Sequence, residues 1–154
     1  MISIYNGNLT SKNYYIFLRY ASKFCDTLTL WGEEYHDSAM QAMFGEHILK
    51  TTHSTRYLSS VHECGLKIYV IKLTPFVLGM LCCASGLFAW KMPFYPEDLC
   101  LFKNGKCWLE TIAHEKLGYI YDDSEETKEF LRSIDVEFEE HPPVSDSEVP
   151  RLPE

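Results

Sequence analysis

Hydrophobic and polar residues alternate in several short stretches of this chain, and each stretch predicts a β-strand. Residues 66–73 read Leu-Lys-Ile-Tyr-Val-Ile-Lys-Leu, which combines this alternation with branched and aromatic side chains. Shorter runs of the same kind occupy residues 2–5, 27–31 and 136–139. We therefore predict a strand at each of these four places.

The clearest local signal is the pair Asn104-Gly105 between two apolar runs, within residues 99–109. Asn-Gly favours a two-residue hairpin turn, because both central residues must accept positive φ. Apolar residues then occupy both faces of the hairpin, so we expect it to lie inside a sheet that is covered on both sides. The facing pairs predicted by this register are Lys103–Lys106, Phe102–Cys107 and Leu101–Trp108.

Other stretches have the spacing of helices. Residues 10–25 place apolar side chains three and four positions apart, and residues 37–49 and 123–134 do so less regularly. Residues 111–121 also predict a helix, weakened by Gly118, whereas the Thr- and Ser-rich residues 50–60 predict a loop.

The segment 75–90 is apolar nearly all round, which predicts a helix buried on more than one side. Thr74 is a good N-cap, and Pro75 suits the first helical position because its missing N–H would have no partner there. A membrane span usually needs about 20 apolar residues, which is more than this segment offers. We therefore expect a core helix and no membrane partner.

The order of these elements predicts a single domain of the α/β or α+β class. Helices that alternate with strands in the first half favour crossover connections, while the hairpin at 99–109 requires an antiparallel pair. We predict a mixed β-sheet with helices packed on its faces, formed by residues 1–141. Residues 142–154 hold four Pro and three Asp or Glu, which predicts a disordered acidic tail.

Cysteine and histidine spacing argues against a metal site. The six cysteines form no C-x-x-C pair that the histidines could complete as a zinc site. We expect neither a metal nor another cofactor. The chain shows no secretory signal pattern, so we expect reduced thiols and a cytoplasmic location.

Residues 96–140, from Pro96-Glu97-Asp98 through the hairpin and Ala113-His114-Glu115 to Glu140, resemble a group of small bacterial proteins. These are uncharacterised proteins of Gram-positive bacteria and their mobile elements, some of them labelled as sporulation proteins. The opening strand and helix match more weakly. Family members carry a Trp-Pro-Gly segment where this chain has residues 56–60, Arg-Tyr-Leu-Ser-Ser. The resemblance implies no catalytic residues.

Charge is distributed unevenly along the chain. Residues 1–96 contain 8 Lys or Arg and 6 Asp or Glu, whereas residues 97–154 contain 6 and 16, so that the net charge of −8 comes from the C-terminal third. Nucleic-acid affinity depends on neutralising phosphates with basic residues, so this pattern argues against a nucleic-acid partner. It favours a protein partner with a basic surface, or it serves only to keep the protein soluble.

These observations predict a non-enzymatic protein-interaction module, of the immunity or inhibitor type, that binds and neutralises another protein. Its acidic contact residues would be Asp122, Asp123, Glu125, Glu126 and Glu129.

The alternative is a small enzyme that uses His114 as general base, with Cys107 or a carboxylate as its partner. Glu115 cannot orient its own neighbour, because adjacent residues on a helix point about 100° apart. His114 therefore needs a third group from elsewhere, and a packing or capping role is the simpler interpretation.

Overall fold

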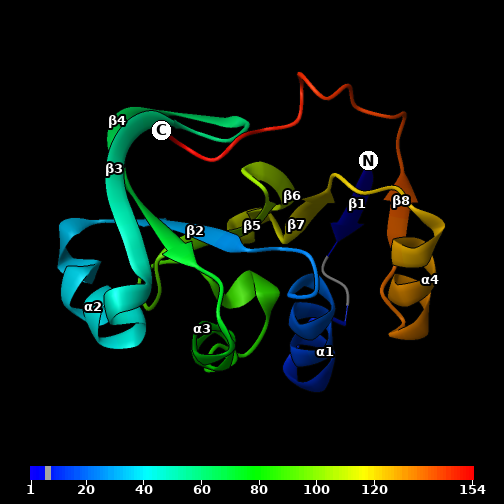
Figure 1. The fold of residues 1–154 in the computed structure, drawn as a ribbon, viewed down its shortest axis with the longest axis horizontal. Helices are drawn as coiled ribbons and strands as arrows, with labels where there is room; N and C mark the ends of the chain where they lie inside the picture. The colour runs from blue at the N-terminus through cyan, green and yellow to red at the C-terminus, as the bar shows by residue number, and fades with distance from the viewer. Residues whose placement is uncertain (6–7) are drawn as a thin grey trace.

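The computed structural model describes residues 1–5 and 8–154 as one eight-stranded antiparallel β-sheet with four α-helices (Figure 1). The predicted single-domain α+β class is confirmed. The strands are β1 (Ile2–Tyr5), β2 (Thr27–Gly32), β3 (Ile48–Tyr57), β4 (Ser60–Lys72), β5 (Glu97–Lys103), β6 (Lys106–Ile112), β7 (Leu117–Ile120) and β8 (Phe138–Glu140). The helices are α1 (Ser11–Ala21), α2 (Asp37–Phe44), α3 (Pro75–Leu81) and α4 (Glu125–Ser133).

The sheet is antiparallel rather than mixed. Its strand order is β3-β4-β2-β5-β6-β7-β1-β8, and every pairing within the described residues is antiparallel. The predicted crossover is present, since β1 and β2 run in the same direction on either side of α1. Three strands, β5, β6 and β7, lie between them in the sheet, so the two never pair.

Side chains alternate between the two faces of the sheet, and both faces are apolar. Leu99 and Leu101 of β5 join the main core, while Cys100 and Phe102 join a second, smaller cluster on the opposite face. The prediction that the 99–109 hairpin is covered on both sides is confirmed, because the residues of β5 and β6 are buried except Lys103 and Lys106 at the tip and Ile112 at the end of β6. Two of its three predicted pairs also hold, whereas a bulge places Leu109, not Trp108, opposite Leu101.

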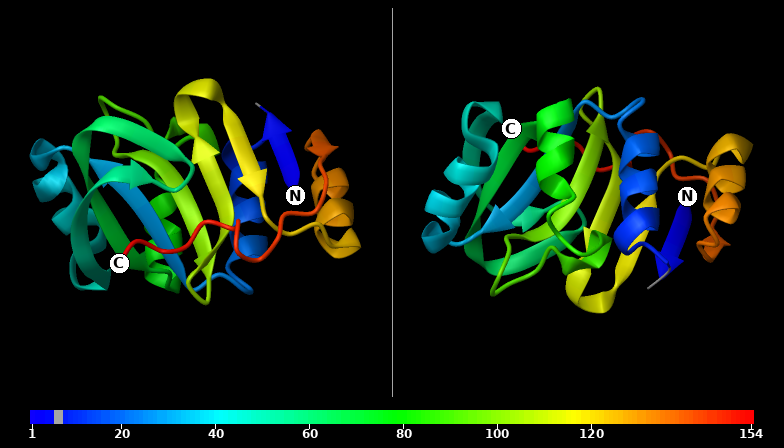
Figure 2. Two further views of the ribbon diagram at one scale, coloured as in Figure 1. Left: turned by 90° about the horizontal axis from the view of Figure 1, so that it is seen from above. Right: turned by 90° about the horizontal axis from the view of Figure 1, so that it is seen from below.

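Helices cover only one face of this sheet. Figure 2 shows α1 and α3 crossing it on one side, with α2 at the β3–β4 end of the same side. Helix α4 packs next to α1 at the other end, where the rings of Tyr20 and Phe130 stack with centroids 3.9 Å apart. The main core therefore lies between the helices and one face, and the other face needs a different cover.

That cover is the far end of the β3–β4 hairpin. Strand β4 pairs with β2 only from Lys67 to Lys72, so residues 60–66 extend beyond the sheet with β3 as their partner. A bulge between Ser54 and Arg56 interrupts the β3–β4 register near this end. The hairpin bends there, as bulged strands do, and its tip lies over the face opposite the helices (Figure 1).

Three segments differ from their predicted structure. Residues 50–60 form most of β3 and its turn instead of a loop, because the β-branched threonines of this stretch suit a strand. Residues 111–121 end β6, make a turn and form β7 instead of a helix. The helix predicted at 75–90 ends at Leu81, and a further short turn at 87–89 follows.

The structure also describes a defined path for residues 142–154, where composition predicts a disordered tail. This segment crosses the face opposite the helices, from the β8 end towards β3 (Figure 2). Its last residue lies beside β3, where Thr52 Oγ1 donates to the carbonyl of Glu154 at 3.2 Å. Val149 and Leu152 pack against the second cluster, which gives the segment the apolar contacts that composition alone did not reveal.

Gly86 and Gly79 give a matched test of how closely the chain after α3 packs against the residues just before α1. A Cβ at Gly86 would lie 2.7 Å from the backbone oxygen of Leu9, whereas one at Gly79, inside α3, meets nothing within 4 Å. We expect Gly86→Ala to lower the free energy of unfolding by about 1–3 kcal/mol through overpacking. Gly79→Ala should raise it by about 0.5–1 kcal/mol, because alanine is the better helix former. Urea unfolding of both variants measures the difference, and equal stabilities would contradict the close approach at Gly86.

Candidate functional site

A groove of about 660 Å³ lies where the acidic third of the chain meets the aromatic end of α1, and we call it the acidic groove. Its walls come from α1, the β5–β6 hairpin, the β7–α4 connection and the C-terminal segment. The lining residues are Tyr20, Phe24, Lys103, Asn104, Lys106, Cys107, Trp108, Tyr121, Asp122, Asp123, Ser124, Glu126, Asp146 and Val149.

Aromatic rings form the floor of the acidic groove. Phe24 meets Trp108 edge-on at 4.9 Å between ring centroids, and Tyr20 lies beside both. Trp108 is only 4% exposed, whereas Phe24 and Tyr121 are half-buried and present part of their rings to the groove. Aromatic rings next to carboxylates suit a cationic side chain such as Lys or Arg, which is attracted to both.

Asp122 fixes the acidic wall to this floor. Its Oδ2 accepts hydrogen bonds from Trp108 Nε1 at 3.2 Å and from Thr127 Oγ1 at 2.7 Å, and its Oδ1 accepts from the Ser124 amide at 3.0 Å. Partial burial raises the pKa of Asp122, but these hydrogen bonds together lower it further, so that the pKa lies below its usual value. Asp122 is therefore ionised and held in place.

Helix α4 begins at this wall, and only some of its acidic residues line the groove. Ser124 is the N-cap, and its side chain accepts from the Thr127 amide. Asp123 and Glu126 are exposed and line the groove. Acidic side chains at a helix start are also stabilised by the helix dipole.

Three of the five predicted contact residues, Asp122, Asp123 and Glu126, thus lie together in the groove. Glu125 and Glu129 do not line it. Glu125 instead pairs with Lys128 at 3.2 Å and with Arg132 at 3.8 Å. Glu129, one helical turn after Glu125, is exposed.

Basic residues form the opposite rim. The Lys103 ammonium lies 5.9 Å from the centre of the Phe24 ring. Lys106 pairs with Asp146 of the C-terminal segment, and Asp146 also accepts from Arg151 at 3.2 Å. The groove is therefore acidic along α4 and basic at the tip of the β5–β6 hairpin.

Three carboxylates of the acidic third lie inside the protein, and sequence reasoning missed them because it assigned the acidic residues to the surface. Glu97, Asp98 and Glu110 are all less than 9% exposed. Glu110 accepts from the Ser59 amide at 3.0 Å, from the Ser59 hydroxyl and from Tyr121 Oη at 2.9 Å. These bonds hold the tip of the β3–β4 hairpin against β6.

Asp98 joins three elements on the same face as Glu110. Its Oδ2 accepts from Trp31 Nε1 at 3.0 Å, and its Oδ1 accepts from the Ala113 amide at 2.8 Å. Its carbonyl accepts from Tyr57 Oη at 2.8 Å. Burial raises the pKa of Asp98, although these hydrogen bonds oppose the shift. Burial also raises the pKa of the neighbouring Tyr57 phenol well above its usual value. All of these contacts are structural.

Of the two partners predicted for His114, Cys107 or a carboxylate, the structure places a carboxylate next to it, that of Glu97. Its Nε2 contacts Glu97 Oε1, and the same oxygen accepts from the Met92 amide at 3.2 Å. Burial raises the pKa of the Cys107 thiol well above its usual value, which keeps it protonated and a poor nucleophile. A carboxylate next to an imidazole can orient a general base, but His114 is 60% exposed and lines none of five cavities formed by the described residues.

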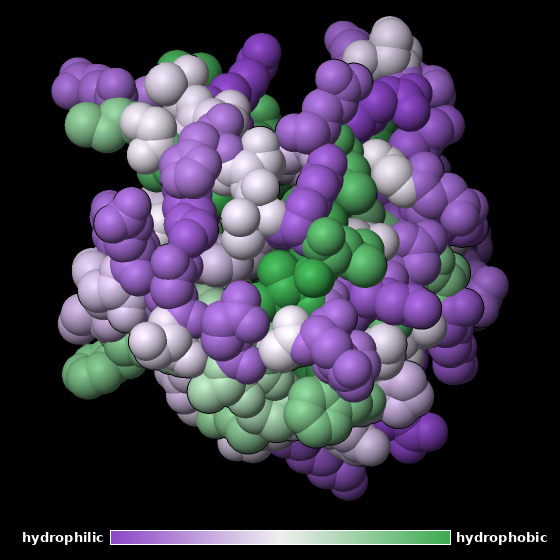
Figure 3. All heavy atoms as spheres, turned by 60° about the vertical axis from the view of Figure 1, so that its left-hand side comes forward, coloured by the Kyte–Doolittle hydropathy of each residue, from purple (hydrophilic) through white to green (hydrophobic). Residues whose placement is uncertain are grey.

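Large apolar side chains are also exposed outside the acidic groove. Among the described residues, they lie on seven segments of the chain. Viewed from the side of α2 and the β3–β4 hairpin, hydrophilic residues cover most of the upper surface, and apolar residues gather lower down, towards the helices (Figure 3). Over the whole described surface, the large apolar side chains that are exposed are Tyr5, Tyr15, Tyr35, Leu49, Val61, Phe76 and Phe94.

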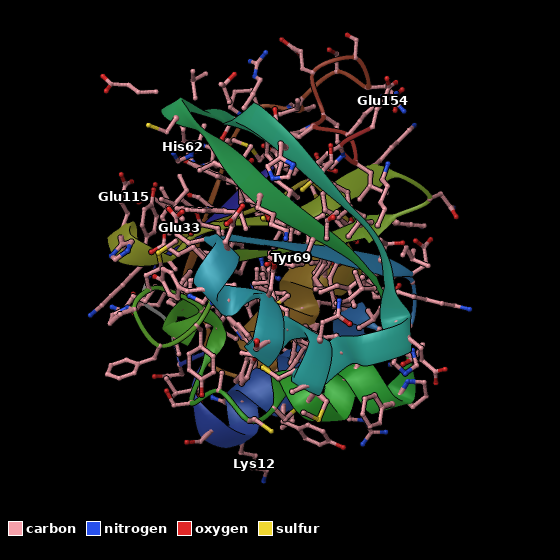
Figure 4. All side chains as sticks on the ribbon, turned by 90° about the vertical axis from the view of Figure 1, so that its left-hand side faces the viewer. Lys12, Glu33, His62, Tyr69, Glu115 and Glu154 are labelled. Carbon is pink, nitrogen blue, oxygen red and sulfur yellow. The ribbon has the colours of Figure 1, made fainter. Side chains whose placement is uncertain are left out.

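A second cavity, of about 750 Å³, lies on the other side of the C-terminal segment, and we call it the hairpin cavity. Strand β3, its turn and residues 147–154 line it. Figure 4 shows Glu154 on this side of the molecule, far from Lys12 of α1. Tyr121 and Val149 line both cavities, so the two are separated only by the C-terminal segment.

Within residues 1–5 and 8–154, no group of three or more His, Cys, Asp or Glu is arranged to hold a metal ion. Among the same residues, no helix is both long and apolar enough to cross a membrane.

Comparison with known proteins finds no matching family, no matching curated protein and no matching solved structure. The resemblance of residues 96–140 to small proteins of Gram-positive bacteria therefore stays a prediction.

The Asp122 hydrogen bonds predict a specific dependence of stability on pH. Because the folded-state pKa of Asp122 is lowered, its contribution is complete above its unfolded pKa of about 4 and is lost as the pH falls through the folded value. We expect Asp122→Asn to be less stable than the wild type at pH 7, and to lose less stability between pH 5 and pH 2. Urea unfolding followed by tryptophan fluorescence measures both slopes.

The control for this experiment is Glu129→Gln, which removes an exposed carboxylate of α4 that does not line the acidic groove. Its pH profile should follow that of the wild type. If Asp122→Asn also declines as steeply as the wild type, Asp122 does not hold the groove wall in the way described.

Proposed function

We propose that this protein is a non-enzymatic interaction module that binds and neutralises another protein through a basic segment of that partner. The observation that carries the proposal is the acidic groove, in which exposed carboxylates line one wall above a floor of aromatic rings. A Lys or Arg side chain fits this combination, because a carboxylate supplies charge and hydrogen-bond acceptors while a ring supplies cation–π attraction.

The charges in the groove are available to a partner to different extents. Asp122 is committed to the protein itself through its three hydrogen-bond donors. Asp123 has only the N-terminal ammonium, at 3.8 Å, and Glu126 takes part in no ion pair among the described residues. Asp123 and Glu126 are therefore the residues proposed to contact the partner.

Neutralisation of the partner fits the same proposal. A groove of this size covers a few side chains of an extended segment, which is enough to block a basic surface that the partner uses elsewhere. Long-range attraction by the acidic third also speeds association with a basic partner and makes it sensitive to salt.

The proposal predicts binding of a blocked heptapeptide of alternating Lys and Val, measured by tryptophan fluorescence at low salt. We expect Asp123→Asn/Glu126→Gln to weaken this binding roughly fivefold, since each partly exposed ion pair contributes about 0.2–1 kcal/mol. Raising the ionic strength should weaken the binding of the wild type more than that of the double variant.

Glu115→Gln is the matched control, because Glu115 is an exposed carboxylate that lines neither cavity. It should bind the peptide as the wild type does. Equal binding of a peptide of alternating Glu and Val, or wild-type affinity in the double variant, would overturn the proposal.

A further inference from the structure

Strand β6 has an unpaired start on the side away from β5. Its ladder with β7 covers residues 109–112, and the last bond of that lane is donated by the Tyr121 amide to the Trp108 carbonyl at 2.9 Å. The chain then leaves the sheet towards α4. The backbone of β6 from Gly105 to Cys107 is thus free for another strand, because antiparallel strands alternate the side on which they bond.

The C-terminal segment fills this place. The Cys107 amide donates to the Pro150 carbonyl at 2.8 Å, and the Leu152 amide donates to the Gly105 carbonyl at 2.9 Å. Together these bonds form a single antiparallel bridge between Lys106 and Arg151. The segment therefore acts as a short added strand in the lane that β7 has left.

This added strand is a poor one. Residues that form a hydrogen-bonded antiparallel pair exchange two bonds, but Pro150 has no amide hydrogen and returns none to Cys107. Pro153 ends the strand on its other side, since proline cannot continue a ladder. Only Val149 and Leu152 pack against the second cluster, and both remain partly exposed.

The C-terminal segment leaves unfilled space on both of its sides. The acidic groove and the hairpin cavity flank it and meet at Tyr121 and Val149. Without residues 149–152 the two would form one trough that runs along the free edge of β6. A trough with free backbone groups at its centre and a pocket on either side is suited to an extended peptide.

We propose that the start of β6 is a strand-addition site, which residues 149–152 fill in the free protein and an extended segment of the partner fills in the complex. The inference rests on the proposed function, because the partner segment reaches this site from the acidic groove. The C-terminal segment is then a displaceable occupant that keeps the site closed until the partner binds.

The charges on either side determine the chemistry and the direction of the partner segment. A strand antiparallel to β6 has its N-terminal residues beside Trp108 and the acidic wall at Asp122 and Asp123, and its C-terminal residues beside Lys106. The segment that fits is basic at its N-terminal end, apolar in the middle and acidic at its C-terminal end. In the free protein Lys106 pairs instead with Asp146, which precedes the added strand.

The test uses the full chain and two blocked peptides of the same composition. The forward peptide is Lys-Val-Lys-Val-Thr-Val-Asp, and the control is the same sequence reversed. We expect the forward peptide to bind at least threefold more tightly than the reversed one. We also expect it to raise the hydrogen-exchange rate of the Leu152 amide at least fivefold, as measured by NMR, because that amide loses its bond to Gly105.

Loosening the C-terminal segment provides an independent measurement. Val149→Ser/Leu152→Ser should bind the forward peptide at least threefold more tightly than the wild type. Val61→Ser is the matched control, since it removes an apolar side chain that is 75% exposed on β4, and it should bind as the wild type does.

The outcomes separate this inference from the proposed function. If binding of the forward peptide requires Asp123 and Glu126 but leaves the Leu152 amide protected, the acidic groove stands and the strand-addition site is rejected. If binding releases the Leu152 amide but ignores those carboxylates, the site stands and the acidic groove is rejected. Equal affinity for the two peptides with a protected Leu152 amide overturns the inference. So does a failure of both peptides to bind the wild type and Val149→Ser/Leu152→Ser.

Discussion

The buried carboxylate of Glu110 is the constraint on which the upper side of this protein depends. It is 2% exposed, and the donors that surround it are an amide and two hydroxyls, none of them charged. A buried polar group is tolerated only when its hydrogen bonds replace those of water, so Ser59 and Tyr121 must stay in place. Ser59 is the turn of the β3–β4 hairpin, which Tyr57 also holds through the Asp98 carbonyl. This carboxylate thus helps to hold the tip of the β3–β4 hairpin over the sheet.

This constraint links the fold to the proposed function. The folded hairpin covers the second cluster on one side, and Tyr121, fixed by the same carboxylate, lines both the acidic groove and the hairpin cavity. A partner segment would therefore enter a trough whose walls are set before binding, which lowers the cost of ordering on the protein's side. The part that must move is the C-terminal segment, which is held by few contacts. Rigid walls and a weakly held occupant together form a site that opens without rearranging the sheet.

How much of this the sequence predicts depends on whether the signal is local. Asn104-Gly105 fixes its hairpin through the φ angles of two adjacent residues, and the helix at 123–134 follows from its own spacing. Residues 111–121 predict a helix, but Leu117–Ile120 form β7. The reason for a glycine at position 118 lies far away in the sequence, since a Cβ there would lie 2.8 Å from the Ile4 side chain. Charge distribution located the acidic wall but not its floor, since Tyr20 and Trp108 meet Asp122 only in the folded chain. The pairing of Glu110 with Ser59 spans 51 residues and leaves no pattern in either stretch.

Hydrogen exchange at the Ser59 amide tests the central claim most directly. Amides in exposed hairpin turns exchange quickly, whereas this amide donates to a buried carboxylate. The structure predicts strong protection of Ser59 in the wild type, and loss of that protection in Glu110→Ala while the amides between β1 and β7 stay protected. A Ser59 amide that exchanges at the unprotected rate in the wild type would show that the hairpin is not held against the sheet, and would remove the wall on which the proposed trough depends.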